Sequence, residues 1–122
     1  MTIIEAINKI DALKPNTYTQ SEKVKWLSML DSLIYKEIVS THEGNLSFEG
    51  YNDDTPIDTV LIAEEPYDDM YIKWLESKID YYNAEYTRYN NSVTVFNDIY
   101  QEFSRYYTRT HKPKTHKVKY FG

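Results

Sequence analysis

The stretch Tyr67–Asn90, YDDMYIKWLESKIDYYNAEYTRYN, has the strongest periodicity in this sequence. Its apolar and aromatic residues recur at intervals of three or four, which places them on one face of an α-helix. These residues are Tyr71, Leu75, Ile79, Tyr82, Tyr86 and Tyr89. The pattern predicts one helix of about 24 residues, roughly 36 Å long. An aromatic face of that length needs a partner, so the rest of the chain is expected to pack against it.

The helical spacing continues beyond this stretch, through Val93, Phe96, Tyr100, Phe103 and Tyr107. Between the two patterns, residues 90–92 read Asn-Asn-Ser and allow two interpretations. They form either a tight turn between two antiparallel helices with facing aromatic stripes, or a bend in one continuous helix. Pro113 marks the end of the helical region.

Two further helices are predicted before this region. Thr2 and Glu5 have the spacing of a capping box, and Pro15 ends the first helix. The second is expected from about Glu22 to Val39, with Thr19 or Ser21 as its N-cap. Its buried face is predicted to contain Trp26, Leu27, Leu30, Leu33, Ile34 and Ile38. The residues expected to face water are Lys23, Lys25, Asp31, Ser32 and Lys36.

Helical periodicity fails between the second and third helices, over residues 40–66, where glycine, proline, asparagine and aspartate accumulate. A segment of this length without regular structure is usually functional or mobile. Within it, residues 58–62 read DTVLI and are either a short strand or an apolar strap over the helices. We expect this loop to be ordered by packing or by a neighbouring subunit.

Composition indicates one globular domain. The chain has 122 residues, 41% of them hydrophobic, with 13 tyrosines but only 3 glycines and 4 prolines, which favours helices and amphipathic contact surfaces. The absence of cysteine excludes disulfides and thiol catalysis, and no apolar run reaches the ~20 residues of a membrane span. We therefore predict a cytosolic all-α protein. A helical domain over residues 1–111 carries a four-helix bundle-like core, and residues 112–122 form an extended C-terminal tail.

Charge is segregated along the chain, although the formal net charge is only −5. Residues 43–69 contain no Lys or Arg, and residues 105–119 contain no Asp or Glu. The predicted acidic loop interface consists of Glu43, Glu49, Asp53, Asp54, Asp58, Glu64 and Glu65. The predicted basic partner-binding residues are Arg105, Arg109, Lys112, Lys114, Lys117, Val118, Lys119, Tyr120 and Phe121. Two oppositely charged ends are therefore expected.

No residue pattern supports catalysis or a cofactor. The acidic cluster around Asp53 and Asp54 lacks the spacing of an EF-hand loop. His42, His111 and His116 are too scattered for a zinc motif and are interpreted as ordinary surface histidines. The glycines do not form a phosphate-binding loop, and no nucleophile elbow is present. No catalytic residue, metal ligand or cofactor is predicted.

Several stretches resemble a family of small proteins encoded by tailed phages and prophages. They are ALKPN at Ala12–Asn16, KWLSMLDSLIYKEI at Lys25–Ile38, PYDDMYIKWLESKIDYYNAEYTRYNNS at Pro66–Ser92 and FNDIYQEFSRYYTRTHKP at Phe96–Pro113. In size and helical layout this family is similar to the head-tail connector, adaptor or head-completion proteins. The resemblance implies a non-catalytic virion structural protein in the virion neck, assembled in the host cytoplasm. It also implies a homo-oligomeric ring, a dodecamer being one form, under the portal protein.

The same resemblance implies contacts with a tail-completion or stopper protein and non-specific contact with packaged DNA, but none with a membrane. The basic C-terminal segment would then be an arm that docks on the portal or on a neighbouring subunit. A competing interpretation is a DNA-binding accessory protein of packaging or regulation that grips phosphates with residues 105–119. A third is a helical interaction module outside any virion, with a flexible tail.

Overall fold

The computed structural model of the chain describes residues 1–44 and 46–114. Over these residues the protein has four α-helices, a 3-10 turn and no β-strand, which confirms the prediction of an all-α fold. In chain order the elements are α1 (Ile3–Leu13), α2 (Gln20–Glu37), η1 (Val39–Thr41), α3 (Asp69–Tyr82) and α4 (Tyr86–Thr110). Lys117, Val118, Lys119, Tyr120 and Phe121, for which partner contacts are predicted, lie outside the described residues.

Both N-terminal helices begin at capping boxes. The Thr2 hydroxyl accepts from the Glu5 amide at 3.2 Å, and the Glu5 carboxylate accepts from the Thr2 amide at 2.9 Å. Thr19 and Glu22 repeat the arrangement at the start of α2, so of the two candidate caps Thr19 is the one used. Because Thr19 is the cap, α2 begins at Gln20, two residues earlier than predicted. The helix ends at Glu37, also two residues earlier than predicted.

The prediction of one helix through Tyr67–Asn90 is wrong, because the chain turns at residues 83–85. The amide of Glu85 donates to the carbonyl of Asp80 at 2.9 Å, and that of Ala84 donates to the carbonyl of Tyr81 at 3.0 Å. This is the Schellman pattern that ends many helices, and its left-handed position is occupied by Ala84 with φ of 59°. Glycine is the usual residue there, so its absence removed the sequence signal for the turn.

Replacing Ala84 with glycine is expected to stabilise the protein by up to about 1 kcal/mol. The Cβ of alanine is unfavourable in the left-handed region, whereas glycine enters it freely. The gain should appear as a higher denaturant midpoint with an unchanged m-value. Ala84→Val is the matched control and should lower the midpoint, because a β-branched residue at this φ is more strained. A loss of stability in Ala84→Gly would contradict the assigned turn.

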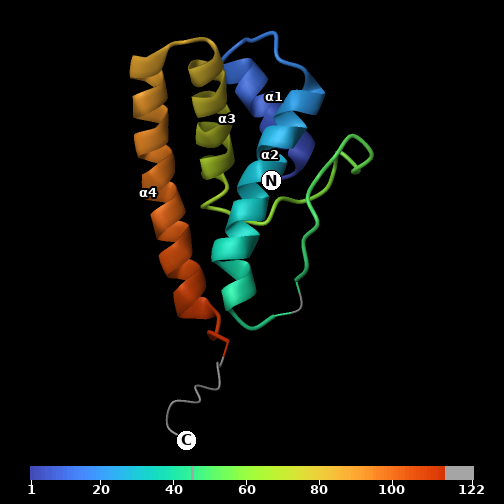
Figure 1. The fold of residues 1–122 in the computed structure, drawn as a ribbon, viewed down its shortest axis with the longest axis vertical. Helices are drawn as coiled ribbons and strands as arrows, with labels where there is room; N and C mark the ends of the chain where they lie inside the picture. The colour runs from blue at the N-terminus through green and yellow to red at the C-terminus, as the bar shows by residue number, and fades with distance from the viewer. Residues whose placement is uncertain (45, 115–122) are drawn as a thin grey trace, which may run out of the picture.

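Helices α3 and α4 form an antiparallel hairpin, and α4 is the longest element of the described chain (Figure 1). Residues 90–92 lie inside α4, so the helix is continuous there and the interpretation as a turn is wrong. The facing aromatic residues meet where Trp74 packs on Phe96, with ring centroids 5.2 Å apart. Tyr82 and Tyr86, predicted on the buried stripe, are exposed instead, because they flank the turn at the end of the hairpin.

The loop from α2 to α3 lies as an apolar strap across the N-terminus of α1. Thr2 and Val60 form an isolated bridge, the Leu61 amide donates to the Met1 carbonyl at 2.9 Å, and the Ile4 amide donates to the Ile57 carbonyl at 2.9 Å. Leu61 and Ala63 are buried in the common core. Of the two interpretations of residues 58–62, the strap is the one observed.

Three predictions for the faces of α2 are wrong. Lys23 and Asp31 were expected in water but are buried, while Leu33 was expected in the core and is 38% exposed. Lys23 tolerates burial because its Nζ lies 2.7 Å from an Asp11 carboxylate oxygen. The aliphatic stem of a lysine can pack on apolar neighbours while its ammonium group reaches such a partner. Asp31 has a different set of partners, described below.

Candidate functional site

All seven predicted acidic loop residues are exposed in the structure, but they do not form one cluster. Asp53 accepts a hydrogen bond from the Ser21 hydroxyl at 2.7 Å, which places it beside the start of α2. Glu64 accepts one from the Tyr106 hydroxyl at 2.8 Å, which places it beside the C-terminal half of α4. Glu43 lies at the far end of α2, where its amide donates to the Lys112 carbonyl at 2.7 Å.

Of the predicted basic partner-binding residues, the four that the structure describes lie in the C-terminal part of α4 and just after it. Arg105, Arg109, Lys112 and Lys114 are all exposed. Arg105 lies 3.7 Å from a Glu102 carboxylate oxygen, and Arg109 carries the positive charge of the last turn. Residues 112–114 pair with residues 41–43, through the Lys114 amide to the Thr41 carbonyl at 3.0 Å and a His42–Pro113 bridge. Glu43 and Lys112 are therefore neighbours, so the charges that are separated in sequence partly meet in space.

His42 sits inside this junction and is only 8% exposed, so its interpretation as a surface histidine is wrong. Its Nδ1 lies 2.7 Å from the carbonyl oxygen of Ile38, which can only accept, so Nδ1 carries the proton. The rings of His42 and Tyr107 form a T-shaped pair with centroids 5.2 Å apart, and the Tyr107 ring also stacks on the ring of His111 at a centroid distance of 3.7 Å. The histidines thus hold the start of the C-terminal segment against η1.

A buried carboxylate fixes the strap to the helices. Asp31 is 0% exposed and accepts from the hydroxyls of Tyr51 at 2.5 Å and Tyr71 at 2.6 Å. Its third donor is the Ile62 amide at 3.1 Å, and the Tyr71 hydroxyl in turn accepts from the Ala63 amide at 2.7 Å. These contacts join α2 and α3 to two parts of the loop between them, one at Tyr51 and the other at Ile62 and Ala63.

Burial dominates the electrostatics of this network. It raises the pKa of Asp31 above its ordinary value, and the hydrogen bonds from Tyr51, Tyr71 and Ile62 oppose that rise. Burial and the Asp31 carboxylate raise the pKa values of both Tyr51 and Tyr71, so both hydroxyls stay protonated and donate. The sequence did contain a signal for the burial of Asp31, because position 31 lies four residues after Leu27 and three before Ile34, on the apolar face of α2.

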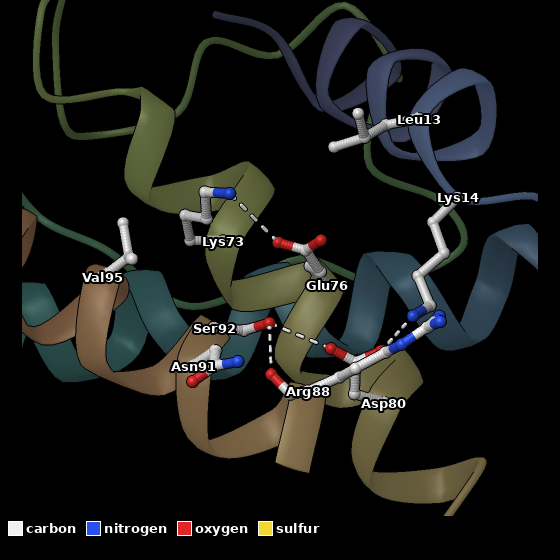
Figure 2. A pocket seen from close by; sticks show the side chains of 9 residues that line it. All are labelled: Leu13, Lys14, Lys73, Glu76, Asp80, Arg88, Asn91, Ser92 and Val95. Carbon is white, nitrogen blue, oxygen red and sulfur yellow. Dashed lines mark hydrogen bonds and ion pairs between the residues drawn. The ribbon is translucent and has the colours of Figure 1, made fainter. Parts of the chain in front are cut away.

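A polar crevice of about 420 Å³ lies where the end of α1 meets α3 and α4 (Figure 2). At its base the Asp80 carboxylate is buried between the Lys14 ammonium group and the Ser92 hydroxyl, which donates to it at 2.9 Å. Lys73 pairs with Glu76 at 3.2 Å on the opposite side, and Arg88 pairs with Glu85 at 3.1 Å. The Lys73–Glu76 and Arg88–Glu85 pairs are local, whereas Lys14, Asp80 and Ser92 come from the end of α1, from α3 and from α4, so this trio acts as a clamp between three helices.

Removing one donor from this clamp should weaken the hairpin. Ser92→Ala is expected to lower the free energy of unfolding by about 1–2 kcal/mol, because Asp80 loses a hydrogen bond while it stays buried. Urea denaturation measures the change. Asn91→Ala is the matched control, since Asn91 is the preceding residue of α4 and is exposed, and it should stay within about 0.5 kcal/mol of the parent. Equal effects of the two substitutions would contradict the clamp.

Within residues 1–44 and 46–114, no three His, Asp or Glu side chains gather closely enough to hold a metal ion. Among the same residues no helix is both long and apolar enough to cross a bilayer.

No protein-family model, curated protein or solved structure matches this chain. The structure by itself therefore assigns the chain only to a fold class. Over its described residues the chain is an all-α protein with four α-helices. Its polar interior groups are bonded to one another, and its charged loop and helix end are exposed.

Proposed function

We propose that this chain is a non-catalytic virion structural protein, a head-tail connector or adaptor subunit that forms a ring under the portal. Its role is head completion and tail attachment in the virion neck, after assembly in the host cytoplasm. The proposal includes a four-helix bundle-like connector fold with a long acidic loop and an extended basic C-terminal tail. The partners are further copies of the chain, the portal protein and a tail-completion or stopper protein, with non-specific contact to packaged DNA.

The observation that supports this proposal most is the position of the two charged surfaces. The loop around residues 50–58 lies beside α1 and α2, whereas α4 forms the opposite edge of the molecule (Figure 1). Asp53 lies on the α2 edge with this loop, away from the basic end of α4, although Glu43 and Glu64 lie beside α4. Opposite charges on two different edges suit a contact in which one face of a subunit meets a different face of the next. Contacts of this kind close into rings when the rotation between subunits permits.

The exposed tyrosines give a second line of support. Tyr81, Tyr82 and Tyr86 are each about half exposed at the α3–α4 turn, and Tyr82 stacks on Trp26 at 5.7 Å. Tyrosine and tryptophan are enriched at protein interfaces, because their rings bury apolar area while their polar atoms remain hydrated. An aromatic patch at one end of the helical hairpin is therefore expected to face another protein.

Co-sedimentation with DNA-filled, portal-containing heads that lack tails tests the proposal. Three proteins are compared: the full chain, a chain ending at Lys114, and a chain ending at Thr110. The Lys114 version keeps the pairing of residues 112–114 with residues 41–43, whereas the Thr110 version loses it. Stoichiometric binding of the full chain is expected. Loss of binding on truncation at Lys114 would assign docking to residues 115–122, and binding of no version would contradict the proposal.

A DNA-binding accessory role is the second candidate. Arg109, Lys112 and Lys114 are exposed, and none has an ion pair within the described chain, so their ammonium and guanidinium groups are accessible to phosphates. This role predicts DNA affinity that falls steeply with salt and disappears when the basic segment is removed. Affinity that is absent even at low salt would eliminate this candidate, and of the connector proposal it would remove only the non-specific contact with packaged DNA.

A further inference from the structure

A groove lies between the first turns of α2 and the loop residues 51–57. It consists of two hollows of about 460 and 380 Å³ that share Ser21, Val24, Asn52 and Asp53 as lining residues. Val24 and Ile3 are buried beneath it, and Ile57 is half-buried at its side, so its floor is apolar.

The wall of this groove is fixed by hydrogen bonds. Ser21 donates to Asp53, the Tyr51 amide donates to the Ser28 hydroxyl at 2.9 Å, and the Tyr51 hydroxyl donates to Asp31. The Asn52 amide also donates to the Thr55 hydroxyl at 2.8 Å. A groove that is already ordered needs little reorganisation to receive a partner, which favours binding.

The rim of the groove is acidic. Glu22 and Asp53 line it, and Asp54 is exposed on the same loop. Lys25 is the single cation among the described residues that line the two hollows. A matching ligand therefore has cationic groups for the rim and apolar or aromatic groups for the floor.

Residues 117–121 of this chain, Lys-Val-Lys-Tyr-Phe, have that chemistry. Two lysines alternate with a valine and a tyrosine, and a phenylalanine follows, so charge and apolar groups are interleaved over five residues. In extended peptides successive side chains point to opposite sides, which would let one set contact the floor and the other the rim.

The groove of the same subunit is out of reach for these residues. Lys114 is held to Thr41 beyond the C-terminal end of α2, whereas the groove lies beside Val24. From Val24 to Glu37 the helix rises about 20 Å. The link from Lys114 to Lys117 spans at most about 10 Å when fully extended. Docking of all five residues, Lys117 included, therefore requires the groove of a second copy of the chain.

We propose that residues 117–121 of one subunit dock in the α2–loop groove of the next copy of this chain. The inference rests on the proposed ring and gives one of its contacts, between residues 117–121 of one subunit and the acidic rim of the groove of its neighbour. The contact is heterologous, as ring closure requires.

Site-directed disulfide formation tests this contact cleanly, because the chain contains no cysteine. One full-length protein carries Gln20→Cys, at an exposed position of the groove, and the other carries Tyr120→Cys. The two are mixed in concentrated solution and on portal-containing heads, oxidised, and examined on non-reducing gels. Gln101→Cys, exposed on α4, replaces Gln20→Cys in the matched control.

The expected result is mixed dimer with Gln20→Cys at about ten times the yield of the Gln101→Cys control. Adding Lys117→Glu and Lys119→Glu to the Tyr120→Cys chain should remove that excess, and so should high salt. Equal yields with Gln20→Cys and with the Gln101→Cys control would overturn the inference. So would a monomeric disulfide in a Gln20→Cys/Tyr120→Cys chain at high dilution, because the arm would then reach its own groove.

The two proposals fail in different ways. If the full chain binds heads but the Gln20–Tyr120 disulfide never exceeds the control, the ring stands and this contact within it is wrong. If the disulfide forms in free protein but heads are not bound, the arm-to-groove contact stands and the role beneath the portal is wrong.

Discussion

Replacing Asp31 with alanine is expected to lower the free energy of unfolding by about 3 kcal/mol or more. The substitution leaves the hydroxyls of Tyr51 and Tyr71 and the amide of Ile62 without their acceptor. Each buried donor without a partner costs about 1–3 kcal/mol, and the strap loses its attachment to α2. Urea denaturation followed by far-UV circular dichroism and by tryptophan fluorescence measures the loss.

The matched control is Ser32→Ala, at the next residue of α2, which is exposed and should be nearly neutral. Tyr71→Phe keeps the buried ring and removes only the hydroxyl, so its effect should be smaller than that of Asp31→Ala. A loss below about 1 kcal/mol in Asp31→Ala would show that water replaces the carboxylate without penalty.

The same network has a defined dependence on pH. Because burial raises the pKa of Asp31, the folded protein holds this proton more tightly than the unfolded chain does. The contribution of Asp31 to stability is therefore fully present below the unfolded pKa. It decreases as the pH rises through the folded pKa. The stability advantage of the parent over Asp31→Asn should shrink across that window, and an advantage that grows with pH would contradict the assignment.

The second large effect is expected from Phe103→Ala, with a loss of about 3–5 kcal/mol. Phe103 is 1% exposed, and its ring packs on Tyr67 and Tyr107 at centroid distances of 5.7 and 5.8 Å. These contacts hold the last turns of α4 against the end of the loop. Truncation leaves a cavity, so hydrogen exchange should become faster at residues 103–110 before the rest of the protein unfolds.

Gln101→Ala serves as the control for Phe103→Ala, because it lies two residues earlier in α4 and is exposed. It should change the free energy of unfolding by no more than about 0.5 kcal/mol. It should also leave the hydrogen-exchange rates of residues 103–110 unchanged. If Phe103→Ala loses stability but residues 103–110 keep their exchange protection, the end of α4 is anchored by other contacts.

Local sequence signals predicted the two N-terminal helices well. The capping boxes at Thr2 and Thr19 are formed by residues three apart, so their geometry is independent of the rest of the fold. The apolar face predicted for the second helix was also largely correct, with Leu27, Leu30 and Ile34 in the core. In these two helices the local helix signals agree with the pattern of buried residues, so their secondary structure can be predicted from sequence alone.

The α3–α4 turn was missed because no local sequence signal marks it. Its left-handed residue is Ala84 instead of glycine, and the aromatic spacing runs across it without interruption. Tertiary packing decides the break, since α3 must end for α4 to return along it. The more obvious turn formers at Asn90–Ser92 remain helical, and Ser92 directs its hydroxyl to Asp80 of the facing helix.

The buried polar residues were missed for a related reason. A charged residue on the apolar stripe of a helix is normally predicted to lie at the boundary between the buried and the exposed face. Only its partners show that it is buried. For Asp31 the partners come from residues 51–71, and for Lys23 the partner is Asp11 of α1. Such contacts join segments that are distant in sequence, so no local pattern contains them.

Cryo-electron microscopy of tailless heads after incubation with the full-length chain shows directly whether the proposed ring forms. A closed ring of identical subunits beneath the portal is expected. In that ring, the end of α4 of each subunit faces the acidic loop of its neighbour. Absence of added density, or density arranged as two-fold pairs in which identical faces meet, would contradict the proposal.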